Sequence, residues 1–442
     1  MRIHSTYLSP AVMSKNNKNL VSFFREAAPY IHLHRGKTFV IALSGEVLEH
    51  TKAHEVLSDI AVLSSLGARI VLVHGARPQI DQQLKKINHQ AKVHNGLRIT
   101  DSKTLEISKA SIGTARLEIE NHLNQALNKP PVVNSSLGII SGNFLTAKPL
   151  GVIDGVDYQH TGKVRKVNNT LLKSLLEQGN IVLVSPLGYS PTGQVYNILY
   201  EEAAGNVASS LTADKLIFLH NNKDLAELPR HCNLEQLDKD LLNEHSSLLH
   251  EISRTMHMGV DRTHLIDIES QGGLLLELYT RDGIGSMLST KLYDEPREAH
   301  TADINGIVAL IRPLEAQGTL AKRSRAQLEL DIKSFSVIER DGLIIGCAAL
   351  NPIEGSDTAE LSCLAIHQDY RSGSRGVELV EYIQGRAKKE GLKRLFVLTT
   401  QSIDWFRERG FIEHELSDLP LARQKSYNKE RNSKILFLDL DS

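Results

Sequence analysis

The first two thirds of the chain alternate short apolar, β-branched runs with longer stretches that carry a single apolar stripe. Apolar residues at Val56, Ile60, Leu63 and Leu66 have the spacing of a helix that stops at Gly67. This alternation predicts an α/β fold, a parallel sheet with helices on both faces. Ligands bind such sheets at the carboxyl ends of the strands. The runs expected to be buried strands are residues 38–45, 68–76, 179–188 and 213–220.

Three further segments flank this core. Residues 21–34 predict a helix that Pro29 is expected to end or kink. Residues 221–250 are polar, have no strong period, and indicate an insertion. Strand and loop patterns return at 263–268 and 274–288, so Glu277, which interrupts the apolar run LLLELY, is expected on a strand.

After about residue 299 the pattern predicts an α+β domain. The expected order is a helix at 302–318, two strands within 335–350 joined by an Asp341-Gly342 turn, and a strand at 359–367. A long helix from about Gly376, a strand at 394–400, a short helix at 404–409 and a strand at 434–440 follow. The expected domain limits are 1–19 as a polar extension, 20–290, a linker at 291–298, and 299–442.

Composition and charge exclude several classes of protein. The 442 residues carry 51 Lys plus Arg against 52 Asp plus Glu, a formal net charge of -1. This balance gives no field that would attract nucleic acid or an anionic membrane. No apolar run approaches the roughly 18 residues of a membrane helix, and the first residues lack the apolar stretch of a secretory signal. Three scattered cysteines predict neither a disulfide framework nor a metal site, so we expect a cytoplasmic protein.

The turn RSGSRG at residues 371–376 is the clearest candidate binding site. It joins a strand to a helix, and backbone N–H groups at such a turn can bind a pyrophosphate. The arrangement resembles the acyl-CoA signature of the GNAT acetyltransferase superfamily, with Arg371 first and Gly376 last. Ser374 stands where glycine is usual. The segment WFRERGF resembles a later superfamily segment, with Phe406 in place of a tyrosine that often protonates the leaving thiolate.

Six segments spread over residues 311–436 resemble, in order, the bacterial N-acetylglutamate synthase family: IRPLEAQGTLAKRSRAQLE, GCAAL, AELSCLAIHQDYRSGSRG, LFVLTT, WFRERGF and RNSKIL. The resemblance implies transfer of an acetyl group from acetyl-CoA to the α-amine of L-glutamate, with no metal. Glu360 is then the general base, and backbone N–H groups near Cys363 and Leu364 bind the oxyanion.

The remaining roles follow from the same resemblance. Arg323, Arg431 and Cys363 are the implied glutamate contacts, since a guanidinium holds a carboxylate through two parallel bonds. Thr399 is implied to bond the substrate or the leaving thiolate. The implied acetyl-CoA contacts are Leu364, Ile366, Arg371, Ser372, Gly373, Ser374, Arg375 and Gly376.

The segments VIALSGE, VHGARPQID, HNGLRITD, MGVDRTHLIDI and ELYTRDGIGSM resemble the amino-acid kinase fold, closest to acetylglutamate kinases. Ala42 replaces the essential lysine of the kinases, and Ser44, Ala76 and Arg77 replace glycines, so kinase chemistry is not expected. Relatives with this fold carry an L-arginine site and an N-terminal helix that interlaces subunits, which implies a homo-oligomer of dimers such as a hexamer. The implied arginine contacts are Tyr30, Lys215, His264, Glu277, Gly283 and Gly285.

The resemblance thus favours an arginine-inhibited N-acetylglutamate synthase that opens arginine biosynthesis. Two alternatives stay open. One is an arginine-sensing regulatory protein with an inert transferase domain, against which Glu360 and the paired arginines argue. The other is a GNAT acetyltransferase acting on another amino acid or amine, although Arg323 and Arg431 favour a dicarboxylic substrate.

Overall fold

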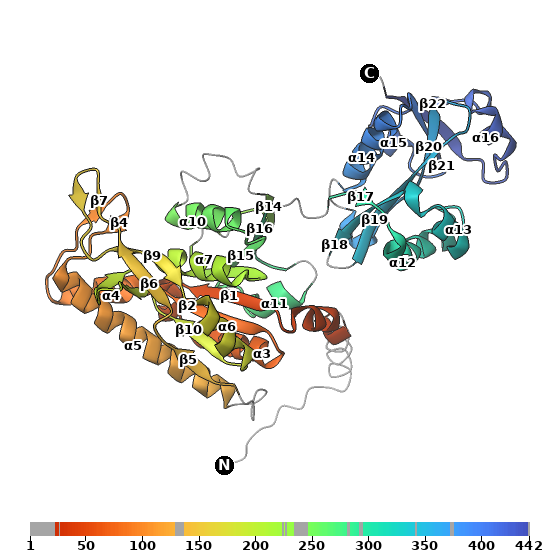
Figure 1. Cartoon of the computed structure of the whole chain (residues 1–442). Coiled ribbons are helices and arrows are strands. Elements are labelled where there is room, and N and C mark those ends of the chain that lie inside the picture. Colours follow the sequence, from red (N-terminus) through yellow and green to blue (C-terminus); the bar gives the residue numbers. More distant parts are fainter. Residues whose placement is uncertain are drawn as a thin grey trace, which may run out of the picture. The chain divides into compact units, whose positions relative to one another are not determined.

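The structure is a computed structural model that describes residues 23–25, 27–128, 137–222, 225, 228–233, 246–280, 283–290, 295–340, 343–371 and 375–440. The chain divides into two compact units, Met1–Lys291 and Leu292–Ser442 (Figure 1). The expected extension at 1–19, the Asp341-Gly342 turn and most of the predicted insertion lie outside the described residues. No helix among the described residues is long and apolar enough to cross a membrane.

An eight-stranded sheet forms the centre of the first unit, in the order β14-β16-β15-β13-β1-β2-β10-β5. Its pairs are parallel except β15 with β16, and Ile41 lies between Leu72 and Ile217. The four predicted strands are confirmed. The strands are β1 (Thr38–Leu43), β2 (Arg69–His74), β5 (Ile139–Ser141), β10 (Ile181–Val184), β13 (Lys215–His220), β14 (His231–Asn233), β15 (Arg262–Asp267) and β16 (Ser286–Ser289).

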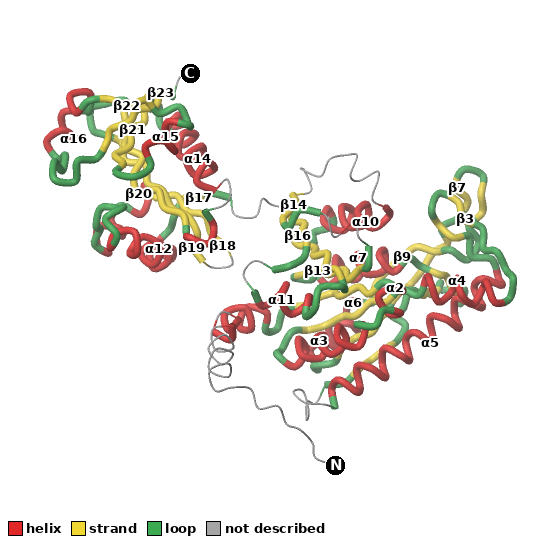
Figure 2. Tube along the Cα trace, turned by 180° about the vertical axis from the view of Figure 1, so that it is seen from behind, coloured by secondary structure: helices red, strands yellow, loops and turns green. Residues whose placement is uncertain are grey.

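Successive residues of the central strands face opposite layers of helices, as the pleat requires. Val40 and Ala42 pack against α6 (Asn169–Glu177), α7 (Tyr200–Leu211) and α10 (Ser246–His257). Phe39 and Ile41 pack on the other face, against α3 (Ala53–Ser65), α5 (Ser102–Leu127) and α11 (Gly273–Tyr279). Figure 2 shows these helices on both faces of the sheet. This arrangement confirms the predicted α/β sandwich.

Short helices and a second, smaller sheet complete the unit. Helices α2 (Gly45–Glu49) and α4 (Arg77–Lys86) follow β1 and β2 directly. The small sheet has the order β12-β11-β6-β9 and was not predicted. Its strands are β6 (Leu145–Pro149), β9 (Gly162–Val167), β11 (Leu187–Tyr189) and β12 (Val195–Asn197). The described residues also form two short hairpins. One, β3 (Val93–His94) with β4 (Leu97–Arg98), precedes α5, and the other, β7 (Val152–Ile153) with β8 (Val156–Asp157), lies between β6 and β9 in sequence.

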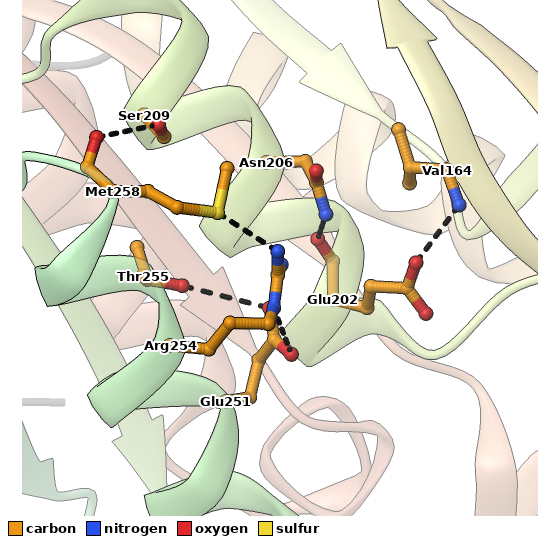
Figure 3. Close-up of polar contacts among 8 residues, drawn as sticks. All are labelled: Val164, Glu202, Asn206, Ser209, Glu251, Arg254, Thr255 and Met258. Carbon is orange, nitrogen blue, oxygen red and sulfur yellow. Dashed lines mark hydrogen bonds and ion pairs between the residues drawn. The ribbon is translucent and has the colours of Figure 1, made fainter.

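Polar contacts tie α7 to its neighbours (Figure 3). Ser209 Oγ donates to the carbonyl oxygen of Met258, after α10, at 3.0 Å, and the N–H of Val164 on β9 donates to Glu202 Oε1 at 2.8 Å. A side chain at Gly205 would collide with α10. The absence of a Cβ there is what lets α7 and α10 approach closely.

One local prediction for this unit was wrong, and another was wrong in part. The apolar run at 274–279 is the helix α11 rather than a strand, and its buried Leu274 and Leu278 are four residues apart, the spacing of one helix face. A short apolar run fits either structure, which explains the error. Pro29 does not end the N-terminal helix, which continues to His34.

The second unit is built on a seven-stranded sheet in the order β17-β18-β19-β20-β21-β23-β22. Its strands are β17 (Arg297–Glu298), β18 (Phe335–Arg340), β19 (Leu343–Pro352), β20 (Thr358–Ile366), β21 (Arg394–Thr399), β22 (Ile412–His414) and β23 (Lys434–Asp439). Helices α12 (Ile304–Ala316) and α13 (Arg325–Leu330) cover one face, and α14 (Arg375–Lys389) and α15 (Ile403–Arg407) the other. A last short helix is α16 (Leu421–Lys425). The predicted α+β order is confirmed.

Candidate active site

A pocket of about 940 Å³ opens in the second unit where two strands of its sheet part. Strands β20 and β21 are the one parallel pair of this sheet, and their last paired residues are Glu360 and Phe396. Beyond that point β20 pairs with β19 alone and β21 with β23 alone. The space between the diverging strands is the pocket, which residues 360–366 and 397–402 line from its two sides.

A β-bulge lies in the wall that β20 contributes. Cys347 pairs with Ala365 but Ala349 pairs with Ser362, so Cys363 and Leu364 both face Ala348. Cys363 has a φ of 53°, the left-handed region that non-glycine residues rarely adopt and that costs about 1–3 kcal/mol. The bulge takes the backbone of Cys363 and Leu364 out of the regular ladder, and both residues line the pocket.

Glu360 stands at the point of divergence, paired with a residue that the sequence did not single out. Arg423 of α16 donates from Nε to Glu360 Oε2 at 2.8 Å and from Nη2 to Oε1 at 3.2 Å. The two side chains are 15% and 23% exposed, so this is a partly buried, bidentate ion pair. Arg423 itself is held by Ser426, whose carbonyl oxygen and Oγ accept from Nη1 at 3.1 Å.

The two predicted substrate arginines line the same pocket. Arg323 Nη2 donates to Ser362 Oγ at 3.2 Å, and its backbone N–H donates to Glu315 Oε1 at 2.8 Å. Arg431 Nη2 donates to the carbonyl oxygen of Thr319 at 2.5 Å. Arg323, Arg423 and Arg431 are three of the five described arginines that line the pocket, a cationic lining suited to a dicarboxylate.

Thr399 lies at the end of β21, in the opposite wall. Its Oγ1 accepts from the backbone N–H of Ser402 at 3.0 Å and of Gln401 at 3.4 Å. The hydroxyl proton can still donate to a group in the pocket. Phe406, in the position of the superfamily tyrosine, is buried in the core below α14 and also lines the pocket.

The predicted pyrophosphate turn is described only in part. Leu364, Ile366, Arg371 and Gly376 line the pocket, and Arg371 Nε donates to the carbonyl oxygen of Ile366 at 3.3 Å. Ser372, Gly373 and Ser374 lie outside the described residues. The guanidinium of Arg375, which begins α14, lies 5.1 Å from the Tyr370 ring centroid.

Five of the six residues of the predicted arginine site come together in the first unit. Lys215 Nζ lies 3.2 Å from His264 Nε2, and His264 Nδ1 lies 2.6 Å from Glu277 Oε1. The backbone N–H groups of Ile284 and Gly285 donate to Glu277 Oε2 at 2.7 and 2.8 Å. A side chain at Gly283 would collide with the same carboxylate. Both carboxylate oxygens of Glu277 are therefore bonded within the protein. The residue lies on the helix α11 rather than on the expected strand.

The electrostatics of this cluster fix its protonation. Burial, with the Lys215 charge, lowers the pKa of His264 to about 4. The imidazole is therefore neutral at pH 7, with Nδ1–H donating to Glu277 and Nε2 accepting from Lys215. Burial alone would raise the pKa of Glu277, but its hydrogen bonds from His264, Gly285 and Ile284 lower it to about 2. Tyr30 lies on the helical segment 27–34, whose His34 Nε2 hydrogen-bonds the carbonyl oxygen of Leu278 at 2.7 Å.

Comparison with known proteins identifies both units. Residues 37–230 match the amino acid kinase family, and residues 313–411 match the acetyltransferase (GNAT) family. The amino-acid acetyltransferase of Azotobacter vinelandii is 44% identical over 95% of this chain and 99% of its own. That of Yersinia pseudotuberculosis is 42% identical over 97% and 100%. The chain belongs to the amino-acid acetyltransferase family. It is therefore an acyltransferase enzyme, as the sequence predicted.

Solved structures of the family extend the comparison. N-acetylglutamate synthase from Neisseria gonorrhoeae complexed with coenzyme A and L-arginine is 36% identical, with a TM-score of 0.86 over 96% of this chain and 99% of that one. The complex of that enzyme with coenzyme A and N-acetyl-glutamate has a TM-score of 0.61 at 38% identity over the same shares. Among the described residues of this member of the amino-acid acetyltransferase family, no cluster of three or more His, Cys, Asp or Glu could hold a metal ion.

Proposed function

We propose that the enzyme is an N-acetylglutamate synthase, which transfers the acetyl group of acetyl-CoA to the α-amine of L-glutamate and releases N-acetyl-L-glutamate and CoA. The observation that carries this proposal is the pocket between β20 and β21, which Glu360 lines together with five of the described arginines. The similarity to the solved synthase supports it.

Glu360 starts the reaction by removing a proton. The amine of glutamate is protonated at neutral pH and cannot attack a thioester until it loses that proton. Glu360 accepts the proton directly or through a water. An ionised carboxylate has about four lone-pair sites, and the bidentate bond to Arg423 occupies two of them, so two remain for this role.

Acyl transfer then proceeds by direct attack. The amine nitrogen bonds to the thioester carbon, and the negative charge that develops on the carbonyl oxygen is stabilised by backbone N–H groups at the bulge of Cys363 and Leu364. The C–S bond breaks as the tetrahedral intermediate collapses, and the CoA thiolate leaves and takes up a proton. The Thr399 hydroxyl lies in the pocket as a donor to substrate or thiolate.

Substrate selection rests on charge. Arg323 and Arg431 bind the carboxylates of glutamate, and Arg423 lies within the same pocket. The turn between β20 and α14, including Arg371 and Gly376, binds the CoA pyrophosphate, and Leu364 and Ile366 pair with the pantetheine arm as an added strand would. A polyamine or a peptide lysine would be repelled by this cationic lining.

Regulation by L-arginine belongs to the first unit. Its kinase-like fold has Ala42, fully buried, where phosphoryl transfer would need a cation, so we assign it ligand binding instead. The guanidinium of arginine would bind Glu277, beside His264 and Lys215, with Gly283, Gly285 and Tyr30 completing the site. Binding there would inhibit acetyl transfer, as feedback on the first step of arginine biosynthesis, in a homo-oligomer.

Product identification tests the proposal. The purified chain is incubated with acetyl-CoA and each of a panel of amino acids, with and without L-arginine, and products are identified by mass. N-acetylglutamate formation that arginine suppresses is the expected result. A different acetylated amino acid would favour the alternative acetyltransferase, and no thiol release from any amine would favour an inert, arginine-sensing protein.

A further inference from the structure

Two of the three cysteines lie side by side in the second unit, at the wall of the transfer pocket. Cys347 is on β19 and Cys363 on the neighbouring strand β20, and both are free thiols. Cys347 Sγ donates to the carbonyl oxygen of Cys363 at 3.5 Å. The two sulfur atoms are also within hydrogen-bonding reach of each other. The thiols are therefore in direct contact, although 16 residues separate them in sequence.

The β-bulge is what brings these two side chains together. Side chains along a strand alternate between the two faces of a sheet. Ala359 and Leu361 of β20 accordingly pack on the α14 face, but Cys363 packs on the α12 face, together with Cys347. The change of face occurs at the bulge, where Cys363 has a φ of 53°. Adjacent strands lie about 4.8 Å apart, and a disulfide spans roughly 4.4–6.8 Å between Cα atoms, so two cysteines on one face of adjacent strands can be bridged.

The two thiols differ in access and in acidity. Cys363 lines the pocket and is 5% exposed, whereas Cys347 is fully buried. The hydrogen bond from Cys347 lowers the pKa of Cys363 in spite of burial; the Arg323 charge acts in the same direction, and the Glu315 charge opposes it. The same hydrogen bond, with burial, raises the pKa of Cys347. Because the thiolate is the reactive form, Cys363 is the thiol that a small oxidant in the pocket meets first.

We propose that Cys363 and Cys347 form a reversible redox pair, which inhibits acetyl transfer when a hydroperoxide enters the pocket. The Cys363 thiolate attacks one oxygen of hydrogen peroxide, the O–O bond breaks, and a sulfenic acid and hydroxide form. The Cys347 thiol then attacks the sulfenic sulfur and the S–O bond breaks. The displaced hydroxide takes the thiol proton, which leaves a disulfide and water. Both thiols are oxidised and the peroxide is reduced, and a dithiol reverses the change by thiol–disulfide exchange.

The bond affects transfer because Cys363 belongs to the bulge. Its backbone N–H is one of the proposed oxyanion donors, and bonding its sulfur to Cys347 moves that group relative to the reacting carbonyl. A misplacement of about 1 Å can cost about 100-fold in rate. This loss of activity rests on the oxyanion role proposed above, whereas the formation of the disulfide does not. Neither depends on which amino acid is acetylated.

Peroxide treatment of the full chain tests the pair. No Lys or Arg lies between Arg340 and Arg371, so trypsin releases both cysteines in one peptide, residues 341–371. After oxidation and alkylation of the remaining thiols, this peptide should escape alkylation and be about 2 Da lighter than its reduced form, by the loss of two hydrogen atoms. Acetyl transfer by the same sample, followed as the mass of the acetylated product, should fall about 100-fold and return after dithiothreitol.

Two matched variants identify the bond. Cys347→Ser keeps a donor to the carbonyl of Cys363 but cannot form a disulfide. Its Cys363 should be oxidised further to a sulfinic acid, about 32 Da heavier, and dithiothreitol should not restore its activity. Cys232→Ser is the control, since Cys232 is on β14 of the first unit, and it should behave like wild type.

Three results would overturn the proposal. The first is that peptide 341–371 never becomes about 2 Da lighter. The second is that the lighter peptide accompanies full activity. The third is that oxidised Cys347→Ser recovers with dithiothreitol as wild type does. If Cys347→Ser does not fold, the mass of the wild-type peptide and the activity of the same sample decide between these outcomes.

Discussion

Arg423 holds both carboxylate oxygens of Glu360 in a bidentate ion pair, at 2.8 and 3.2 Å. The pair fixes the orientation of the proposed base at the point where β20 and β21 diverge. Because a general base must be held in position to take up a proton, this pair links the short helix α16 to the proposed chemistry.

Replacing Glu360 tests the base directly. Glu360→Gln should lower kcat by about two to four decades, the range for loss of a general base, because glutamine cannot take up the ammonium proton. The KM for acetyl-CoA should stay near its wild-type value, since the proposed CoA contacts are backbone groups further along β20 and the turn. Steady-state kinetics of thiol release at neutral pH check both. Near-normal turnover would remove Glu360 from the mechanism.

A double-mutant cycle separates the role of Arg423 from that of Glu360. Arg423→Ala leaves a partly buried carboxylate without its partner and should cost about 1.5–3 kcal/mol of stability as well as lowering kcat. If Arg423 acts by positioning Glu360, the same change in a Glu360→Gln background should lower kcat much less. Equal losses in both backgrounds would mean that Arg423 acts on the substrate alone. Arg423→Lys, which keeps the charge but not the two parallel bonds, should fall between wild type and Arg423→Ala.

The thiol of Cys363 is expected to be dispensable. Cys363→Ala keeps the backbone N–H of the bulge and removes only a buried side chain, so kcat should stay within a few-fold of wild type. Cys363→Gly should relieve the φ of 53° but loosen the strand. Turnover abolished in Cys363→Ala, in a variant that unfolds at the wild-type temperature, would point to a nucleophilic thiol instead.

Local periodicity was enough to predict most of the fold. The short apolar, β-branched runs of β1, β2, β10 and β13 alternate with longer helical stripes, and this alternation indicated buried parallel strands. The run at Leu274–Tyr279 could not be resolved, because six residues fit a strand or two helical turns. The small sheet was not predicted, because its strands are only three to six residues long and mostly half-exposed.

The site was predictable where it carries a motif and not elsewhere. Glu360 and Gly376 lie in a contiguous signature, whereas Arg423 is 63 residues from Glu360 in a five-residue helix with no recognisable pattern. Contacts between segments so distant in sequence depend on the tertiary fold.

The stability of the first unit should fall as the pH drops from about 6.5 to about 2. The pKa of His264 is lowered to about 4 from 6.5, so its contribution is present above pH 6.5 and is lost as the pH falls through 4. The pKa of Glu277 is lowered to about 2 from 4.5, so its contribution is lost between those values. The sign of this pH dependence is checked by measuring the Tm of wild type and of Glu277→Gln across this range. The two plots of Tm against pH should converge at low pH, and a constant difference in Tm would contradict the linkage.

Arginine regulation provides the last test. An effector changes activity only if it binds two conformations unequally, so the response must depend on contacts that arginine makes. Glu277→Ala removes the proposed partner of its guanidinium and should weaken arginine affinity about 10- to 100-fold, the equivalent of about 1.5–3 kcal/mol for a charged hydrogen bond. Uninhibited turnover should change little, because Glu277 belongs to the first unit and the transfer site to the second. Glu269→Ala is the matched control, since Glu269 is an exposed carboxylate paired with Lys52 in the same unit. If Glu277→Ala and Glu269→Ala are both inhibited at the wild-type arginine concentration, arginine binds elsewhere, and the enclosed cluster of Lys215, His264 and Glu277 is a structural element of the first unit.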